Sequence, residues 1–316
     1  MEIKKNIPLE KMTTFKIGGP ARYFCAVENI DDLAEAQQFA VSNNIKTFIL
    51  GGGSNILFSD RGFDGLVIKI QNEALSLKQE TSGKYTIQSS AGTPLSKLAA
   101  FSIKNSLTGL EWAMGVPGLV GGAIQGNAGA FGSEMKDCIS IVRTVDRESS
   151  NWSNLMEISC DDCNFSYRNS AFKENKNHII WDCEINLSKG NKLEIEKKVL
   201  KYASHRSKKQ PPLAKFPSAG SIFKNPVVSK KVHEAFEHDM EVKCRTDRIP
   251  AGWLIERCDL KGKRIGNAMV SRKQANFIIN LGKATAEDVI ILISFIKMKA
   301  RNEFGVQLKE EIQVVL

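Results

Sequence analysis

The chain of 316 residues carries 44 Lys and Arg against 35 Asp and Glu, for a formal net charge of +9, and 42% of its residues are hydrophobic. This length suffices for a sizeable core in two or three domains, which excludes a small disulfide-stapled fold. No apolar run approaches the length of a membrane span, and Met1–Glu10 lacks the apolar stretch of a signal peptide. We therefore expect a cytoplasmic globular protein that does not bind membranes.

Seven cysteines are scattered along the chain, an odd number that predicts reduced thiols rather than a disulfide framework. Cys160 and Cys163 form a C-x-x-C, but a zinc site needs a second such pair or suitably spaced histidines. His233 and His238 are five residues apart, so they do not share a helical face. The sequence therefore predicts no metal site.

Lysine and arginine concentrate between residues 197 and 209. This cluster lacks interleaved aromatic residues, and no nucleic-acid-binding signature accompanies it. We interpret it as a solvated basic face and predict no nucleic-acid partner. A surplus of positive charge also suits an enzyme with anionic ligands.

Hydrophobic periodicity and capping signals predict a mixture of helices and strands. Helices are expected at 28–44, from 93 to about 106, before 205, and at 285–304. The first has Leu33, Ala36 and Ala40 on one stripe, and in the last Thr285 and Asp288 resemble a capping box and Gly305 ends the helix. Strands are expected at 46–50, 85–90, 139–145, 178–187 and 306–316. Because helices and strands do not alternate in a strict βαβ rhythm, the fold class is predicted to be α+β. The prolines of Gln210-Pro211-Pro212 predict a linker, and hence domains at 1–205 and 206–316.

The last segment alternates between apolar and polar residues, as expected for a strand with one buried face. The apolar face holds Val306, Leu308, Ile312, Val314 and Leu316. The polar face holds Gln307, Lys309, Glu311 and Gln313, whereas Glu310 falls among the apolar residues. This pattern places Glu311, rather than Glu310, on the accessible face.

Two glycine-rich segments follow or interrupt predicted elements. Gly51-Gly52-Gly53-Ser54-Asn55 follows a strand, and its backbone N–H groups could approach a pyrophosphate closely. It is neither a G-x-G-x-x-G fingerprint nor a Walker loop, so the residues alone favour a tight turn over phosphate binding. Gly115–Gly132 holds seven glycines in eighteen residues, which favours a surface against which a flat cofactor lies.

Two shorter segments gather polar side chains that could act on a substrate. Ser218–Pro226 places a hydroxyl, an ammonium and an amide in one strand-like run. Ser221, Phe223 and Asn225 are predicted on one side and Lys224 on the other, unless a bulge intervenes. Phe165–Ser170 sets a guanidinium beside a phenol, a pair that is more often structural than functional. Neither segment identifies a function by itself.

Taken together, these motifs resemble the MurB reductase family. Seven segments appear in the family's order and cover residues 12 to 312, namely Thr13–Ala21, Leu50–Asn55, Gly115–Gly132, Tyr167–Ser170, Ser218–Pro226, Leu254–Gly262 and Ala275–Phe277. The form Asn127–Gly132, without a tyrosine-bearing insertion before Ser218, is similar to the shorter subtype of the family.

The resemblance implies a fold and a reaction. The fold would be a two-lobed FAD-binding domain of the vanillyl-alcohol-oxidase (PCMH) type, with lobes at about 1–72 and 73–205, followed by an α+β substrate domain. The cofactor would be non-covalent FAD, with NADPH as co-substrate. The reaction would reduce UDP-N-acetylglucosamine enolpyruvate to UDP-N-acetylmuramate in peptidoglycan precursor synthesis. A monomer is expected.

The resemblance also assigns roles to individual residues. Ser221 would donate a proton, and Arg168 and Glu311 would complete the catalytic set. The substrate-binding residues would be Tyr167, Lys224, Asn225 and Gln274. The cofactor would be bound by Gly51, Gly52, Gly53, Ser54, Asn55, Gly118, Gly121, Gly122, Asn127 and Gly129.

The chain departs from the family pattern at a few positions. Gly126 replaces a usual methionine, Lys273-Gln274 stands where a histidine often occurs, Lys309 replaces a common glutamate, and Gln313 replaces a frequent arginine. None of these departures affects the catalytic set. Two other functions remain as alternatives: an FAD-dependent oxidase of the same superfamily, and a non-catalytic regulator that binds flavin or a UDP-sugar.

Overall fold

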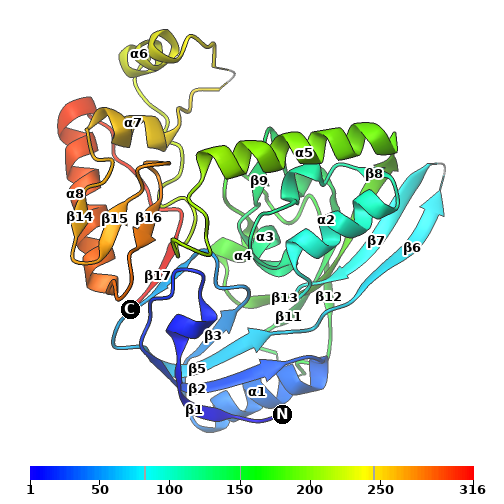
Figure 1. Cartoon of the computed structure of the whole chain (residues 1–316). Coiled ribbons are helices and arrows are strands. Elements are labelled where there is room, and N and C mark those ends of the chain that lie inside the picture. Colours follow the sequence, from blue (N-terminus) through cyan, green and yellow to red (C-terminus); the bar gives the residue numbers. More distant parts are fainter. Residues whose placement is uncertain (82, 150, 245) are drawn as a thin grey trace. The chain divides into compact units, whose positions relative to one another are not determined.

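The computed structural model describes residues 1–81, 83–149, 151–244 and 246–316 (Figure 1). The chain divides into two compact units. The first unit comprises Met1–Ile7, Ala21–Gly52 and Asp64–Arg206. The second unit comprises Pro8–Pro20, Gly53–Phe63 and Ser207–Leu316.

A four-stranded sheet with the order β1-β2-β5-β3 forms one part of the first unit. Its strands are β1 (Lys4–Pro8), β2 (Pro20–Val27), β3 (Thr47–Leu50) and β5 (Phe63–Ile70). Helix α1 (Ile30–Ser42) begins where the Asn29 side chain accepts a hydrogen bond of 2.9 Å from the Asp32 N–H. The predicted stripe of Leu33, Ala36 and Ala40 is buried in the same core as residues of β2 and β5, and α1 lies beside this sheet (Figure 1).

A larger antiparallel sheet with the order β12-β11-β13-β7-β6 forms the rest of the first unit, and β8 also pairs with β13. Its strands are β6 (Leu75–Thr81), β7 (Lys84–Ser90), β8 (Leu107–Thr108), β11 (Ile139–Asp146), β12 (Met156–Ser159) and β13 (His178–Lys189). The accompanying helices are α2 (Leu95–Lys104), α3 (Val120–Gln125), α4 (Ala171–Glu174) and α5 (Lys192–Lys209). Short elements between them are η2 (Glu111–Ala113), β9 (Gly129–Ala130), β10 (Ser133–Glu134) and η3 (Met135–Asp137). Because α3 contacts both β7 and β13, it rests on the centre of this sheet.

The second unit has its own core, which combines residues from early and late parts of the chain. Its elements are η1 (Leu9–Met12), β4 (Ile56–Phe58), α6 (Lys230–Met240), α7 (Ala251–Arg257), β14 (Arg264–Ile265), β15 (Ala268–Val270), β16 (Ile278–Asn280), α8 (Ala286–Phe304) and β17 (Gln313–Val315). Phe15 and Leu57 are buried together with Ile222, Leu254 and Leu292. Strands β14, β15 and β16 form an antiparallel sheet, and β17 pairs in parallel with β4.

The predicted helix at 285–304 is confirmed, and both of its end signals act as expected. Thr285 and Asp288 form a reciprocal capping box, in which each side chain accepts a hydrogen bond from the other residue's backbone. Gly305 ends the helix with a φ of 67°, a conformation that favours glycine. The mixed helices and strands confirm the α+β class.

The predicted strand at 306–316 is wrong in its length and in its final residues. Only Gln313–Val315 forms a strand, and the chain bends at Ile312. The bend reverses the alternation, so Val315 is buried while Val314 is exposed and Leu316 is 85% exposed. The predicted apolar face therefore holds for Val306, Leu308 and Ile312 but fails beyond them.

Each of the two units is built from three separate segments of the chain, whereas the sequence predicted two contiguous domains. In the later part of the chain the division falls between residues 206 and 207, one residue from the predicted boundary. However, segments 8–20 and 53–63 belong to the second unit, although the prediction assigned them to the N-terminal domain. The predicted lobe boundary at residue 72 lies between β5 and β6. Among the residues described, no helix combines the length and hydrophobicity needed to cross a membrane.

Asp60 should contribute to the stability of the second unit, because both of its carboxylate oxygens lie 2.9 Å from the Ala286 N–H at the start of α8. We expect Asp60→Ala to lower the free energy of unfolding by about 1 kcal/mol through the loss of this cap. Urea unfolding followed by circular dichroism would measure the change. Asp64→Ala is the control: its ion pair with Arg22 is exposed, so its effect should stay within about 0.5 kcal/mol. Equal effects of the two substitutions would contradict the role of Asp60.

Candidate functional site

In the first unit, Gly51 and Gly52 of the first glycine-rich segment lie against the second glycine-rich segment. A Cβ atom added at Gly52 would lie 2.9 Å from the Gly118 Cα, and one added at Gly51 would lie 3.8 Å from the Leu119 side chain. A side chain at position 52 would therefore displace the backbone at 118. The absence of side chains at Gly52 and Gly118 is what lets the two segments come into contact.

Helix α3 contains two adjacent glycines with different surroundings. A Cβ at Gly121 would lie 2.8 Å from the Ala91 Cβ, and the Gly121 N–H donates to the Ala91 carbonyl at 2.9 Å. Gly121 therefore has a packing role. A Cβ at Gly122 would meet no described atom within 4 Å. Gly122 thus borders open space, as a residue that lines a ligand should.

The loop after β3 presents backbone donors. Within the described part of the chain, the N–H groups of Gly52, Gly53, Ser54 and Asn55 donate no hydrogen bond. Gly53 has a φ of 62°, and its added Cβ would lie 2.1 Å from the Met12 carbonyl oxygen, so only glycine fits there. Consecutive N–H groups of this kind bind anionic oxygens, which fits the pyrophosphate of a dinucleotide.

Asn127 and Arg168, both in the first unit, are linked by a hydrogen bond from the Arg168 guanidinium to the Asn127 carbonyl. Asn127 is fully buried, and its side chain donates to the Ser166 carbonyl and to Glu134 while it accepts from the Lys136 N–H. The Arg168 guanidinium donates to the Gly129 carbonyl at 2.7 Å and to the Asn127 carbonyl at 3.4 Å. The Asn127 side chain is therefore engaged within the protein, and the Asn127–Gly129 backbone positions Arg168.

Arg168 occupies a strained turn. Ser166 and Asn169 exchange two backbone hydrogen bonds of 3.1 Å, so Tyr167 and Arg168 form the tip between them. Arg168 has a φ of 56°, which is uncommon for a residue other than glycine. Its guanidinium also lies 5.4 Å from the centre of the Tyr167 ring. Such strain in a polar turn is typical of functional sites.

In the second unit, Asn276 fixes the segment that contains Ser221. Its carbonyl accepts from the Ile222 N–H at 2.8 Å, and its side-chain amide bonds to both the N–H and the carbonyl of Phe223 at 3.0 and 2.8 Å. The chain bends at Ile222, and both Ile222 and Phe223 are buried. The alternation predicted from Ser221 to Asn225 is therefore interrupted at Ile222, within the stretch where the prediction allowed for a bulge. Ser221 itself is partly exposed.

The segment that contains Glu311 lies beside the Ser221 segment. The Glu311 N–H donates to the Ile222 carbonyl at 2.7 Å, and the Asn55 side chain donates to the Glu311 carbonyl at 3.1 Å. The Glu311 backbone thus contacts both the residue after Ser221 and the Asn55 side chain, although these residues are far apart in the sequence. Glu310 forms an ion pair with Lys297 at 2.7 Å, which gives it a structural partner.

The predicted substrate-binding residues of the second unit also have structural contacts. The Asn225 side chain accepts from the Ala251 N–H at 3.1 Å, at the start of α7. The Gln274 side-chain oxygen accepts from the Asn276 N–H at 3.4 Å. Lys224 is partly buried, and its N–H donates to the Lys309 carbonyl at 2.9 Å. The contacts of Lys224 and Asn225 fix the backbone on the C-terminal side of Ser221.

Three buried donors in the first unit could not be recognised from the sequence. Trp112 Nε1, Arg147 Nε and Arg206 Nε are buried without a hydrogen-bond partner among the described residues. The Arg206 guanidinium donates to the Trp112 carbonyl at 2.7 Å, and its burial lowers the pKa of this group. Arg206 belongs to the basic cluster at 197–209, which the sequence presents as a solvated face. Only the fold distinguishes it from its exposed neighbours.

Comparison with known proteins identifies both parts of the chain. Residues 21–151 match a family described as an FAD binding domain, and residues 210–315 match one described as UDP-N-acetylenolpyruvoylglucosamine reductase, C-terminal domain. The reductase of that name from Carboxydothermus hydrogenoformans is 39% identical over 99% of this chain and 94% of its own length. The one from Lachnoclostridium phytofermentans is 37% identical over 98% of this chain and 92% of its own length. The crystal structure of the Thermus caldophilus enzyme covers both chains completely, with a TM-score of 0.78 and 29% identity.

Gly122 provides a test of where the flavin lies. Alanine is about 1 kcal/mol more favourable than glycine in a helix, and the Gly122 side faces open space, so Gly122→Ala should leave the apoprotein stable. Its methyl group would occupy space that the cofactor needs, and we expect FAD affinity to fall at least about tenfold, which is about 1.4 kcal/mol. Reconstitution of the apoprotein followed by flavin fluorescence would measure it.

Gly126→Ala is the matched control at the other end of α3, because its added Cβ would make an ordinary contact of 3.5 Å with the Gly122 carbonyl. This variant should bind FAD like the unmodified protein. Unchanged affinity in Gly122→Ala would show that this residue does not line the cofactor.

Proposed function

The chain belongs to the UDP-N-acetylenolpyruvoylglucosamine reductase family, and from this premise we propose that it reduces UDP-N-acetylglucosamine enolpyruvate to UDP-N-acetylmuramate with NADPH. The family places it among the FAD-containing oxidoreductases of peptidoglycan precursor synthesis. The observation that supports the proposed chemistry is the backbone hydrogen bond from the Glu311 N–H to the Ile222 carbonyl, because it places the two segments that carry Ser221 and Glu311 side by side.

FAD fits the residues proposed to hold it. The donor groups of Gly52, Gly53, Ser54 and Asn55 suit its pyrophosphate, and Gly122 leaves room for a flat ring system. We propose that Gly51, Gly118, Gly121, Asn127 and Gly129 complete the set, with Asn127 acting through its backbone and its packing. When bound, FAD supplies the hydride chemistry between NADPH and the enolpyruvyl double bond.

Arg168 is proposed to stabilise the charge that develops on the substrate. As the terminal carbon of the enolpyruvyl group gains hydride, negative charge develops toward the carboxylate. A guanidinium can pair with a carboxylate through two hydrogen bonds, and one such preorganised donor contributes roughly 3–4 kcal/mol to transition-state stabilisation. Its hydrogen bonds to Gly129 and Asn127 support this role, because they fix the side chain before the substrate arrives.

Ser221 is proposed to complete the reduction by donating a proton to the adjacent substrate carbon. A serine hydroxyl is a weak acid, so this step requires close positioning and a neighbour that replaces the proton. Asn276 holds the backbone on the C-terminal side of Ser221, which supplies the positioning. Glu311 and Lys224 lie on segments that pair with each other beside Ser221, and we propose that one of them restores the proton.

Further features belong to the same proposal. Tyr167, Lys224, Asn225 and Gln274 are proposed to bind the substrate or the nicotinamide nucleotide. The protein is proposed to act as a monomer in the cytoplasm. All seven cysteines are unpaired, which suits a reducing compartment.

The activity and the role of Ser221 can be tested in one set of measurements. NADPH oxidation by the FAD-loaded protein should depend on UDP-N-acetylglucosamine enolpyruvate. In Ser221→Ala, NADPH should still bleach the flavin at a nearly unchanged rate, because that step needs no proton at the substrate carbon. The return of flavin colour on addition of the substrate should slow by roughly 10²–10⁴-fold in stopped-flow measurements.

Other outcomes separate the alternatives. NADPH oxidation that ignores the enolpyruvyl substrate, with oxygen consumed in its place, would point to an oxidase. Flavin binding without turnover would indicate a regulator. Normal turnover by folded, FAD-loaded Ser221→Ala would assign the proton to another group.

The two adjacent glutamates near the C-terminus should have separate roles. Glu311→Gln should impair substrate reduction while the protein remains folded, because the proposed proton-transfer group is lost. Glu310→Gln should retain most activity and lose at most about 1 kcal/mol of stability, since it removes a partly exposed ion pair with Lys297. Steady-state rates and thermal melting of both variants would measure this. An inactive, folded Glu310→Gln beside an active Glu311→Gln would reverse the assignment.

A further inference from the structure

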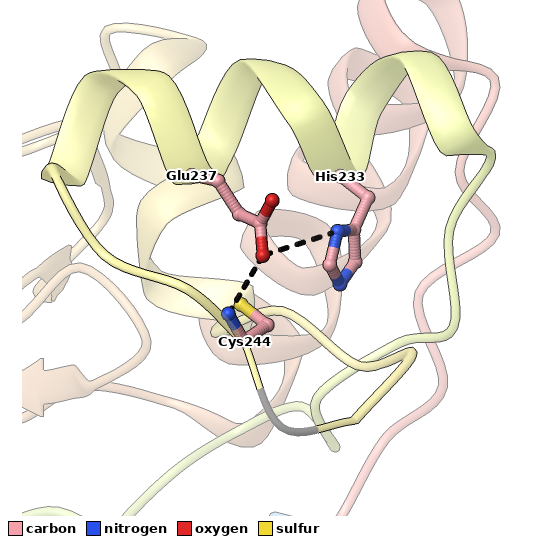
Figure 2. A group of neighbouring side chains, drawn as sticks. All are labelled: His233, Glu237 and Cys244. Atoms are coloured by element: carbon pink, nitrogen blue, oxygen red, sulfur yellow. Dashed lines mark hydrogen bonds and ion pairs between the residues drawn. The ribbon is translucent and has the colours of Figure 1, made fainter.

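Three side chains that no part of the proposed reaction uses converge beside helix α6 (Figure 2). His233 and Glu237 are one turn apart on the same face of α6, and Cys244 lies on the segment that follows the helix. One imidazole nitrogen, one carboxylate oxygen and the thiol sulfur all lie within 4.8 Å of one another. Each is an atom that can coordinate a transition metal.

Hydrogen bonds hold these groups in an orientation suited to coordination. His233 Nε2 lies 3.0 Å from the Thr246 carbonyl oxygen, so Nε2 carries the proton and Nδ1 keeps its lone pair. Nδ1 lies 3.9 Å from Glu237 Oε1. A backbone carbonyl that accepts from the outer nitrogen is the usual second partner of a metal-binding histidine.

Glu237 connects the helix to the cysteine. Its Oε1 accepts a hydrogen bond of 2.7 Å from the Cys244 backbone N–H, which Figure 2 shows together with the His233 contact. This bond keeps the segment that carries the thiol against α6. The three groups are partly buried, so their positions are constrained more than those of surface side chains.

The distances between the three ligand atoms are close to those of a tetrahedral zinc site, and zinc binds this mixture of nitrogen, oxygen and sulfur ligands. Zinc bonds of about 2.0–2.3 Å to nitrogen, oxygen and sulfur place tetrahedral ligand atoms roughly 3.3–3.8 Å apart. Separations of up to 4.8 Å need only small side-chain rotations to close around an ion. His233 and Cys244 also line an open hollow of about 480 Å³ with Asp247 on its wall, which leaves room for a fourth ligand.

We propose that His233, Glu237 and Cys244 form a Zn²⁺-binding site with a fourth position open to water or Asp247. The sequence predicted no metal site because its two histidines on this helix, His233 and His238, do not share a face. In the structure, only one of these histidines, His233, belongs to the cluster. Its partners are Glu237 on the same face of α6 and Cys244 beyond the helix. The metal would fasten the segment after α6 to the helix.

Cobalt titration of the FAD-loaded, chelator-treated protein would test the site. Co²⁺ should bind with about one equivalent and give a sulfur-to-metal charge-transfer band, read as a difference spectrum against the flavin. Zn²⁺ should then abolish the band. Cys244→Ser should remove the band, and His233→Gln or Glu237→Gln should weaken binding at least about tenfold, as loss of ligand-set residues commonly does.

Two matched controls keep the test specific. Cys160→Ser removes another partly exposed thiol, and His238→Gln removes a histidine of α6 that does not share a face with His233. Both should retain the band. Circular dichroism should confirm that every variant is folded. In the unmodified protein, Zn²⁺ should slow alkylation of Cys244 but not of Cys160.

No charge-transfer band, or a band that persists in Cys244→Ser, would overturn the proposal. Equal loss of binding in the two control variants would do the same, and so would alkylation of Cys244 at an unchanged rate in Zn²⁺.

Discussion

The hydrogen bond from the Glu311 N–H to the Ile222 carbonyl organises the second unit. This 2.7 Å hydrogen bond joins the last residues of the chain to the Ser221 segment. Asn55 adds two further hydrogen bonds to the same residues. The Asn55 side chain donates to the Glu311 carbonyl, while the Asn55 carbonyl accepts from the Gln313 N–H. Three segments from distant parts of the sequence therefore depend on one another. Buried backbone groups need hydrogen-bond partners. Ordinary backbone pairing therefore positions the segments that carry the proposed proton-transfer groups.

In the first unit, the corresponding constraint is that neighbouring backbone segments pass so close to each other that only glycine fits between them. Gly52 lies against Gly118, Gly121 lies against Ala91, and an added Cβ at Gly129 would lie 2.4 Å from the Ser133 carbonyl oxygen. Each glycine costs about 0.5–1 kcal/mol of conformational freedom relative to alanine in regular structure. Contacts between neighbouring segments offset this cost. Many of the glycines that suggest a cofactor surface are thus required first by packing, and Gly122 is distinguished from them by the open space beside it.

The sequence predicted elements best where the deciding interactions are local. Helix α8 was found from Thr285, Asp288 and Gly305, since caps and left-handed ends are encoded within a few residues. The end of the chain was mispredicted because β17 takes its register from β4, some 250 residues away, after a bend at Ile312. Arg206 looked like its exposed neighbours because burial is a property of the fold. The site roles came from a family resemblance, and for Ser221, Arg168 and Glu311 they stay predictions.

The discontinuous second unit constrains the order in which the protein can fold during synthesis. Phe15, Leu57 and strand β4 leave the ribosome long before β17, their partner strand, and most of their shared core. Until residues 313–315 emerge, the β4 edge has no parallel neighbour and its apolar side chains stay accessible. Such late pairing between distant segments is slow and exposes a nascent chain to aggregation. A truncation that removes residues 313–315 would therefore leave β4, a strand from the N-terminal part of the chain, without its parallel partner.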